Sequence, residues 1–333
     1  MSKSKTNLIT AITISGKLTI AHYLFVLKPI LAIKKNYNFF FSIADLHAIT
    51  TKHVSNELIK LRQQTANYLF ACGFPSNEIF VQSQISGHSK MAFILGCHTN
   101  IGTLLRMTQF KSKKNRNFQN LALLNYPLLM ASDILLYDAD VWVGNDQKQH
   151  VELTRDLAQK INNSFHQKIF YQPNLINNSF FNYRIRDLQK PTVKMSKSSQ
   201  DPRGIIFFHD NSEIIKDKII ACKTDSENKI IFDFEKKPGI SNLILLYAMS
   251  KNITIEKTVL ILQKKCSNYF ILKQMVAASI IEIITPIQKN VQNYQDDSKL
   301  VNKYLEEGRK RAQKQVDSKF KKIQKILGFN FIN

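Results

Sequence analysis

The sequence predicts an α/β fold, with a parallel sheet in its first part and a helical second part. Short apolar segments alternate with helical patterns from Leu8 to about Ile161. From about Pro202 onward the apolar spacing is helical throughout. The chain has 333 residues, 44% of them hydrophobic, so it can bury the core of one large domain and a smaller one.

The first predicted element is a buried strand over Leu8–Ile14, an apolar and β-branched run. It ends at Ser15-Gly16-Lys17, and a helical pattern follows with His22 in its first turns. Strand, glycine turn and helix form the opening unit of a parallel sheet, in which the helix N-terminus attracts anions. His22 is therefore placed to reach a phosphate, although a histidine that covers the core edge fits the same pattern.

The remaining elements follow from the same periodicities. A helix over Glu57–Ala71 is expected to stop at Gly73, and the lysine-rich segment 111–117 is expected to be an exposed loop. Further strands are predicted at Phe39–Ala44, Ile79–Ser83 and Val141–Val143. Later helices are predicted at Ile214–Cys222, Ile240–Met249, Met275–Val291 and Lys299–Leu327.

A long polar run follows the strand at Val141–Val143. The strand gives way at Gly144 to a helix whose apolar side includes Leu153 and Leu157. Capping of that helix by Asp146 explains one carboxylate but not the polar residues after it. Because open α/β sheets bind ligands at the carboxyl ends of their strands, this segment is predicted to lie in a binding site.

A second polar segment reads Lys194-Met195-Ser196-Lys197-Ser198. It places two ammonium groups three residues apart on a short loop entered from Pro191-Thr192. Mobile point charges suit the stabilisation of negative charge that builds on a polyphosphate. A solvated turn has the same composition, so the segment gains its meaning from the others.

Taken together, these segments resemble the bacterial-type tryptophanyl-tRNA synthetases, which are class I aminoacyl-tRNA synthetases. The stretch from Ser15 to His22 stands where the family has its HIGH-like signature, and residues 194–198 match its KMSKS loop. The match also takes in Asp45–Thr50, Arg106–Lys111, Tyr126–Tyr137, Gly144–Asp156, Thr224–Ser226 and Pro238–Leu243. The resemblance implies a Rossmann-like catalytic domain over residues 1–200. It also implies a mainly helical anticodon-binding domain over residues 201–333, with its last helix able to pack back on the catalytic domain.

The resemblance implies an enzyme that activates L-tryptophan with ATP and transfers it to the 3′ end of tRNA(Trp). Tryptophan carboxylate is already ionised at pH 7, so the first step needs positioning and charge stabilisation rather than a general base. By resemblance Lys194 and Lys197 neutralise the phosphates, helped by Lys111 or Lys113 and by His22. Mg²⁺ would bridge the phosphate oxygens without a dedicated protein site. The implied ATP-binding residues are Thr13, Ile14, Ser15, Ala21, His22, Gly144, Asn145, Asp146, Ile185, Lys194, Met195, Ser196, Lys197 and Ser198.

Asp133 is the candidate for recognition of tryptophan. An indole offers one N–H donor and no acceptor, so a selective pocket needs a buried acceptor beside an apolar slot. Asp133 follows Met130 by one helical turn, in a run that is otherwise nearly all apolar. By resemblance Tyr126, His47, Gln147 and Val143 are its pocket neighbours.

Several residues depart from the family pattern, among them Thr13, Ile14, Ala21, Phe25, Asn145 and the pair Arg186-Asp187. Ala21 stands where a glycine normally lets adenine approach the backbone. Three functions therefore remain open: a tryptophan-specific enzyme, a tyrosine-specific relative, and a weakly active or inactive synthetase-like RNA-binding protein. Pyrophosphate exchange with each amino acid separates them.

The charge balance indicates a polyanionic partner. Lys and Arg number 47 against 25 Asp and Glu, a formal charge of +22. An AT-rich genome would also raise the lysine content. The amphipathic segment Lys299–Leu327, with Lys310, Arg311 and Lys314, is predicted to approach the tRNA backbone near the anticodon, and a solvated helix face is the alternative.

The remaining expectations concern location and assembly. The cysteines Cys72, Cys97, Cys222 and Cys266 are scattered, which indicates neither a zinc site nor a disulfide framework. No apolar run approaches the roughly 20 residues needed to span a bilayer, so no membrane partner and a cytoplasmic location are predicted. The resemblance implies a homodimer.

Overall fold

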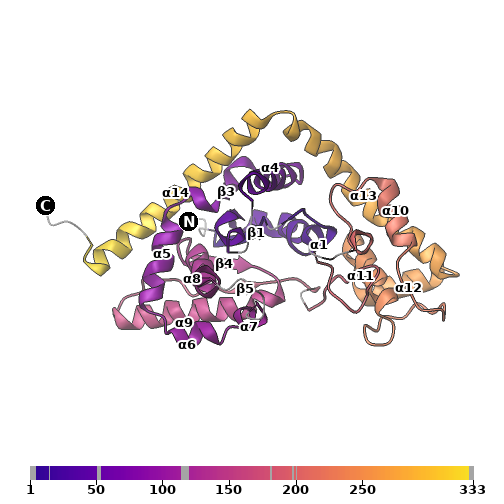
Figure 1. Cartoon of the computed structure of the whole chain (residues 1–333), viewed down its shortest axis with the longest axis horizontal. Coiled ribbons are helices and arrows are strands. Elements are labelled where there is room, and N and C mark those ends of the chain that lie inside the picture. The colour runs from indigo at the N-terminus through magenta and orange to yellow at the C-terminus, as the bar shows by residue number, and fades with distance from the viewer. Residues whose placement is uncertain are drawn as a thin grey trace. The chain divides into compact units, whose positions relative to one another are not determined.

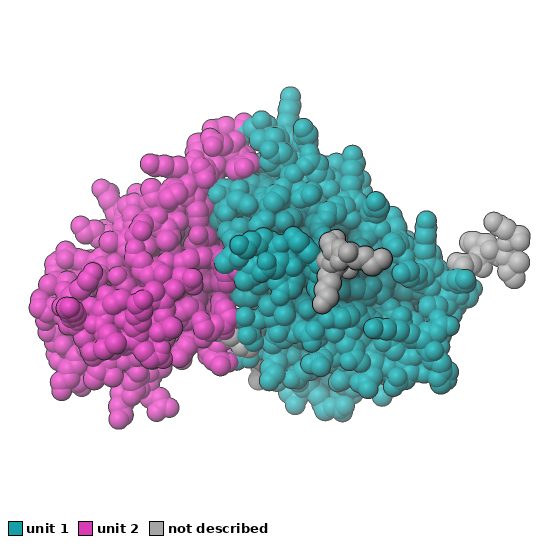
Figure 2. All heavy atoms as spheres, turned by 180° about the vertical axis from the view of Figure 1, so that it is seen from behind, with its two compact units in different colours: residues 1–15, 30–177, 297–333 teal, residues 16–29, 178–296 magenta. Residues whose placement is uncertain are grey.

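The computed structural model describes residues 5–14, 16–50, 54–113, 120–180, 182–196, 199 and 201–329. It separates into two compact units, coloured in Figure 2. Unit 1 comprises Met1–Ser15, Ile30–Asn177 and Asp297–Asn333, and unit 2 comprises Gly16–Pro29 and Asn178–Asp296. The predicted division at residue 200 differs from these units, because two segments group with residues distant in sequence. The roles predicted for the two domains stay predictions.

Unit 1 is built on a five-stranded sheet with the order β3-β2-β1-β4-β5, and every pair of neighbours is parallel. The strands are β1 Asn7–Thr13, β2 Asn38–Ala44, β3 Ile79–Val81, β4 Ala139–Trp142 and β5 Leu175–Ile176. In the central pair Leu8 lies opposite Phe39. The predicted α/β class is confirmed, and the first four strands lie where they were predicted.

The helices of unit 1 enclose this sheet. Lys111 begins the segment predicted as a loop, but residues 111–113 are helical, since the amide of Lys111 donates to the carbonyl of Met107 (3.1 Å). The rest of that segment lies outside the described residues. The α-helices are α3 Asp45–Ala48, α4 Ser55–Ala71, α5 Gly87–Cys97, α6 Ile101–Leu105, α7 Thr108–Lys113, α8 Leu121–Leu135, α9 Lys148–Ser164 and α14 Ser298–Leu327. Helix α2 Lys28–Ile33 contains the point in the sequence where unit 2 gives way to unit 1. The 3₁₀ turns are η2 Lys34–Asn36, η3 Ser76–Glu78, η4 Gln82–Gln84 and η5 Asn145–Gln147.

The long helix α14 runs beside α4, α5 and β3 (Figure 1). Gly308 permits the approach, because a Cβ there would lie 1.6 Å from the carbonyl oxygen of Ile79. Arg311, one turn further, donates to the carbonyl oxygens of Phe39 (2.7 Å) and Asn77 (3.0 Å). Its guanidinium lies 4.1 Å from the centre of the Phe40 ring. Arg311 therefore joins α14 to β2, which corrects the expectation that it faces RNA.

Unit 2 is mainly helical, and its first segment joins it through backbone hydrogen bonds. The amide of Ile20 donates to the carbonyl of Ile206 (2.9 Å), and the amide of Phe208 donates to the carbonyl of Leu18 (3.0 Å). Its elements are α1 Ile20–His22, the π-helical turn η1 Tyr23–Leu27, η6 Pro202–Gly204, α10 Ser212–Ile220, α11 Pro238–Lys251, α12 Ile255–Lys265 and α13 Tyr269–Gln295. Of these, α12 was not predicted.

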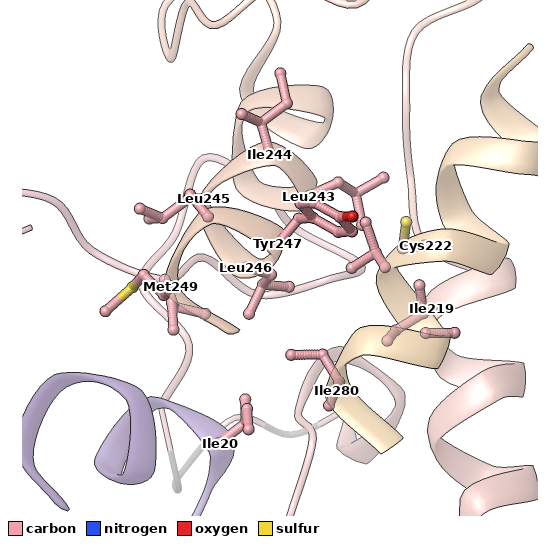
Figure 3. Packing of buried hydrophobic residues seen from close by; sticks show 14 of the residues in the cluster. Ile20, Ile219, Cys222, Leu243, Ile244, Leu245, Leu246, Tyr247, Met249 and Ile280 are labelled. Atoms are coloured by element: carbon pink, nitrogen blue, oxygen red, sulfur yellow. The ribbon is translucent and has the colours of Figure 1, made fainter. Parts of the chain in front are cut away.

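The core of unit 2 forms around α11, which is buried from Gly239 to Ser250. Figure 3 shows Leu243 and Leu246 of this helix together with Ile20, Ile219 and Ile280 from three other elements. A helix that is apolar on all sides is stable only when other elements surround it. The core thus explains why α11 carries so few charged residues.

Helix α13 has the length and composition of a membrane span, with a mean hydropathy of 1.6 over its most apolar window. This corrects the expectation that no segment reaches that length. Its residues Leu272, Val276 and Ile280 are fully buried, and the helix packs against α10 and α11. Burial of one face is the behaviour of a core helix, so its composition alone does not indicate a membrane.

Candidate active site

The strand order of unit 1 reverses between β1 and β4, where open α/β sheets bind ligands. Thr13 ends β1, and Val143 and Gly144 follow β4. His47 lies in α3, directly after β2, and Gln82 opens η4, directly after β3. Polar residues thus follow the carboxyl ends of neighbouring strands.

Asp133, on α8, lies at the centre of a buried hydrogen-bond network. His47 donates from Nε2 to Oδ2 of Asp133 over 2.9 Å, and His88 donates from Nδ1 to Oδ1. Gln82 donates from Nε2 to both carboxylate oxygens, over 2.9 and 2.8 Å. Three donor side chains from α3, η4 and α5 therefore hold this carboxylate in one orientation.

The network also fixes the charge of Asp133. Burial alone would raise the pKa of this carboxyl, but the charge of His88 and the hydrogen bonds from His47 and His88 outweigh it and hold the pKa at about 2. The other ring nitrogen of His88, Nε2, lies 3.1 Å from the Tyr137 hydroxyl. Asp133 is thus an ionised acceptor in an otherwise apolar helix.

Of the other residues predicted around tryptophan, Tyr126 contacts the network directly. The Tyr126 ring meets the His47 ring edge to face at 5.6 Å, and its hydroxyl lies 2.8 Å from Nε2 of His150. Burial, with a contribution from the charge of Asp146, raises the pKa of Tyr126. Met130 and Val143 pack against the unit 1 core. Gln147 instead donates to Oδ2 of Asp146 over 3.0 Å.

Gln82 and His88 belong to the network although neither was predicted as a site residue. Both side chains are fully buried, and Gln82 Oε1 has no hydrogen-bond partner within the described part of the chain. Gln82 cannot turn its amide over without setting Oε1 against the carboxylate of Asp133. The only signal in the sequence is a glutamine directly after a short apolar strand, which is weak.

In unit 2, His22 lies at the start of the first helical segment. Its Nδ1 accepts from the backbone N–H of Thr19 over 3.1 Å and lies 2.9 Å from the Thr19 hydroxyl. Because Nδ1 accepts, the neutral ring carries its proton on Nε2. The helix start therefore orients His22 as an N–H donor, which is what a phosphate contact requires.

Three of the departures from the family pattern have a packing role. Ala21 and Phe25 are both partly buried against the core cluster of unit 2. Ile14, in unit 1, is also buried, at 1% exposure. These three side chains add apolar contacts where the family has smaller or differently shaped residues.

The pair Arg186-Asp187 holds the base of the KMSKS loop. Arg186 pairs with Lys194 in an antiparallel bridge and donates from Nη1 to the carbonyl of Thr192 over 2.8 Å. Asp187 Oδ1 accepts from the amides of Gln189 (2.8 Å) and Lys190 (2.9 Å).

Asp187 also accepts, at Oδ2, from the Ser199 hydroxyl over 3.1 Å. Gly204 leaves room for this carboxylate, since a Cβ there would lie 2.1 Å from its Oδ1. The carboxylate thus ties the turn that precedes the loop to a residue that follows it.

The other predicted catalytic-loop residues are placed as follows. Lys194 and Ser196 are exposed, whereas Ile185 and Met195 are 2% and 4% exposed and belong to the core. The amide of Met195 donates to the carbonyl of Ile185 over 3.0 Å. Ser15, Lys197 and Ser198 lie outside the described residues, as does the side chain of Lys113.

The remaining predicted ATP residues belong to unit 1. Gly144 precedes the 3₁₀ turn η5, and its carbonyl accepts from the amide of Gln147 over 2.9 Å. Asn145 and Asp146 are exposed within that turn, as is Lys111 in α7. Each of these polar groups is open to a ligand from solvent.

Comparison with known proteins decides the family. Residues 1–322 match the model of the class I tRNA synthetases for W and Y. The chain belongs to this family. It is 38% identical to the tryptophan–tRNA ligase of Malacoplasma penetrans, over 96% of this chain and 97% of that protein.

Solved structures agree with this assignment. A tryptophanyl-tRNA synthetase from Mycoplasma pneumoniae superposes with a TM-score of 0.88 at 33% identity and covers 97% of this chain and 98% of its own. The Campylobacter jejuni enzyme, solved with ADP and tryptophan, gives a TM-score of 0.79 at 25% identity and covers 97% and 99% of the two chains. The predicted family and fold class of the synthetase are therefore confirmed.

Proposed function

We propose that this chain is a tryptophan–tRNA ligase, which forms tryptophanyl-adenylate from L-tryptophan and ATP and then charges tRNA(Trp). Relatives with this name match it over nearly their whole length, which agrees with the predicted activity. The observation that carries the proposal is the ionised, buried carboxylate of Asp133 on an apolar helix. Such a group is the acceptor that an indole N–H requires.

Asp133 can accept from the indole if Gln82 gives up one of its two contacts. A carboxylate offers about four lone-pair positions, and three protein side chains make four contacts with it, because Gln82 reaches both oxygens. The indole N–H would replace one of the Gln82 contacts, with Met130 and Val143 beside the ring and Tyr126 and His47 at its edge. Gln147 would contact the polar end of the amino acid. Tyrosine would place a hydroxyl, itself both donor and acceptor, where the pocket offers an acceptor alone.

ATP is assigned to two sets of residues. We assign the ribose to Gly144, Asn145 and Asp146 and place Ile185 and Met195 beside the adenine, with Thr13, Ile14, Ser15 and Ala21 along the nucleotide. The phosphates are assigned to His22, Ser196, Ser198 and the lysines Lys111, Lys113, Lys194 and Lys197. Ammonium groups at these positions would stabilise the state in which charge moves onto the leaving pyrophosphate.

Mg²⁺ would arrive bound to ATP. Within the described ranges no group of three or more His, Cys, Asp or Glu side chains is arranged to hold a metal ion. The lysines assigned to the phosphates are not metal ligands, so the phosphates of ATP would supply the ligands of the ion. Its chemical contribution is to neutralise phosphate oxygens; the chain's own residues position the tryptophan carboxylate for attack on the α-phosphorus.

A homodimer in the cytoplasm is part of the proposal. Unit 1 presents an apolar hollow, and several large side chains around it are exposed: Phe93 (76%), Leu121 (71%) and Ile101 (68%). A contiguous apolar patch of this kind marks a protein interface. A second copy of the chain is the expected occupant, and a monomeric mass in sedimentation equilibrium would contradict this.

The test of the function is ATP–pyrophosphate exchange with purified protein. We expect exchange with tryptophan and none above background with tyrosine. Lys194→Ala should slow exchange at saturating tryptophan, whereas Lys168→Ala, an exposed lysine of unit 1, should not. Exchange driven by tyrosine, or by neither amino acid, would refute the proposal.

A further inference from the structure

Helix α14 carries ten basic and three acidic residues, and the structure separates the basic ones by role. Arg311 binds backbone carbonyls of unit 1. Lys319 is 6% exposed and donates to Oδ1 of Asp138 and to the carbonyl of Ile169 (2.6 Å). Arg309 donates to both carboxylate oxygens of Glu306, at 2.7 Å each. These three side chains are committed to partners within unit 1.

Of the seven other basic residues, Lys322 is exposed on a different side of the helix, and six lysines share one side. Their spacing of four or seven residues places them within about 80° of each other around the axis and along about 39 Å of it. Every one of them is exposed. We call this set the lysine ridge: Lys299, Lys303, Lys310, Lys314, Lys321 and Lys325.

The acidic residues of α14 offset the lysine ridge only in part. Glu306 pairs with Arg309, and Glu307 accepts from the Ser76 hydroxyl. Asp317 accepts from Nε2 of the neutral Gln313 over 2.7 Å and keeps its charge beside Lys314 and Lys321. Six lysines against two carboxylates with neutral donors leave the ridge positively charged and open to solvent.

We propose that the lysine ridge binds the phosphate backbone of tRNA. The inference rests on the proposed function for the identity of the RNA and on charge complementarity for the contact. Lysine is a flexible point charge that neutralises phosphates without reading bases, and a row of such charges matches a polyanion.

The opposite face of α14 argues against a membrane as the partner. Amphipathic helices that bind membranes insert their apolar face between lipids. In α14 that face is occupied, since Val301, Ala312, Val316 and Ile323 are at most 2% exposed. The lysine ridge therefore lacks the exposed apolar face that a membrane-binding helix needs. A surface that binds RNA phosphates needs only the charge.

The test replaces three lysines of the ridge in the full-length protein. Lys310→Gln/Lys314→Gln/Lys321→Gln keeps good helix formers and removes three charges. The matched control, Lys35→Gln/Lys60→Gln/Lys168→Gln, removes three exposed lysines of unit 1 that lie off the ridge. Arg311 and Lys319 are left intact because their loss would disturb packing.

Binding of tRNA(Trp) transcript is measured by fluorescence anisotropy from 50 to 300 mM KCl. We expect the ridge variant to bind about tenfold or more weakly at low salt. The slope of log affinity against log salt should fall by about three, one for each phosphate that a lysine no longer neutralises. The control should keep the parent slope, and pyrophosphate exchange without tRNA should be the same in all three proteins.

Two results would overturn the ridge as an RNA surface. One is a ridge variant that binds tRNA with the affinity and salt slope of the parent. The other is loss of binding to phosphatidylserine vesicles with tRNA binding unchanged. Absence of tryptophan-dependent exchange in the parent would instead count against the proposed function, and the tRNA binding curves would still decide on the ridge.

Discussion

Two aspartates, one in each unit, are almost completely buried and use their carboxylates in different ways. Asp133 is 5% exposed and accepts from His47, Gln82 and His88, which are 86, 51 and 45 residues away. Asp187 is 3% exposed and accepts from amides two and three residues later and from the Ser199 hydroxyl twelve residues later. The first carboxylate depends on the tertiary fold of unit 1, and the second shapes a local turn.

The difference shows how one residue type joins distant elements in one place and shapes a single turn in another. The partners of Asp133 are buried side chains that share this one acceptor, so their donors are left unpaired if it is removed. The amides that Asp187 binds belong to Gln189 and Lys190, on a turn where water can replace the carboxylate. We therefore expect substitutions at the two sites to differ in size and in what they affect.

The largest effect is expected for Asp133→Ala. It leaves two histidines and Gln82 without their shared acceptor, so the free energy of unfolding should fall by about 3–5 kcal/mol. Tryptophan affinity should be lost as well. Urea denaturation and equilibrium dialysis measure the two quantities, and Asp187→Ala serves as the comparison. Equal destabilisation by both substitutions would contradict the contrast between the two carboxylates.

The second prediction concerns the stability of the fold at low pH. The pKa of Asp133 is about 2 in the folded protein against an ordinary value of 3.8, so its contribution to stability is present above about pH 4 and lost as the pH falls through about 2. A shift of this size corresponds to about 2 kcal/mol. Asp133→Asn should lack this part of the acid dependence in urea titrations between pH 5 and pH 2.5. The control Asp217→Asn, at an exposed position, should keep it.

The smallest effect is expected for Ser199→Ala. Loss of one hydrogen bond to Asp187 should cost about 1 kcal/mol or less of stability. Adenylate formation should slow severalfold in single-turnover measurements while tryptophan binding is unchanged, because only the base of the KMSKS loop is loosened. Ser267→Ala, at an exposed position of unit 2, is the control. A change in tryptophan affinity alone would place Ser199 in a different role.

The parts of the structure that could be predicted are those with a strong local pattern. Strands β1 and β2 are long apolar runs, whereas β5 has two residues after Pro173-Asn174 and gives no periodic signal. Asp133 can be identified because an unpaired carboxylate in an apolar helix is costly. Its partners Gln82 and His88 cannot be, since their contacts depend on how α5 and η4 pack against α8.

Two charged residues show that the sequence does not give the direction of a side chain. Arg311 carries the charge expected of an RNA contact, yet its position on α14 turns it toward β2. In the sequence Asp187 stands out only as a departure from the family pattern, although it accepts three hydrogen bonds at the base of the loop. Sequence reveals the charge of such residues, and only the fold reveals the direction in which they point.

The packing of α14 has a consequence for synthesis of the protein. The carbonyls of Phe39 and Asn77 accept hydrogen bonds from Arg311, and Gly308 packs closely against the carbonyl of Ile79. The ribosome adds Gly308 and Arg311 more than two hundred residues after these partners. Until then the growing chain carries a β-sheet edge and apolar residues without their cover. Unit 1 therefore closes only after Arg311 has been synthesised, and until then the open strand edge of the nascent chain is exposed to aggregation.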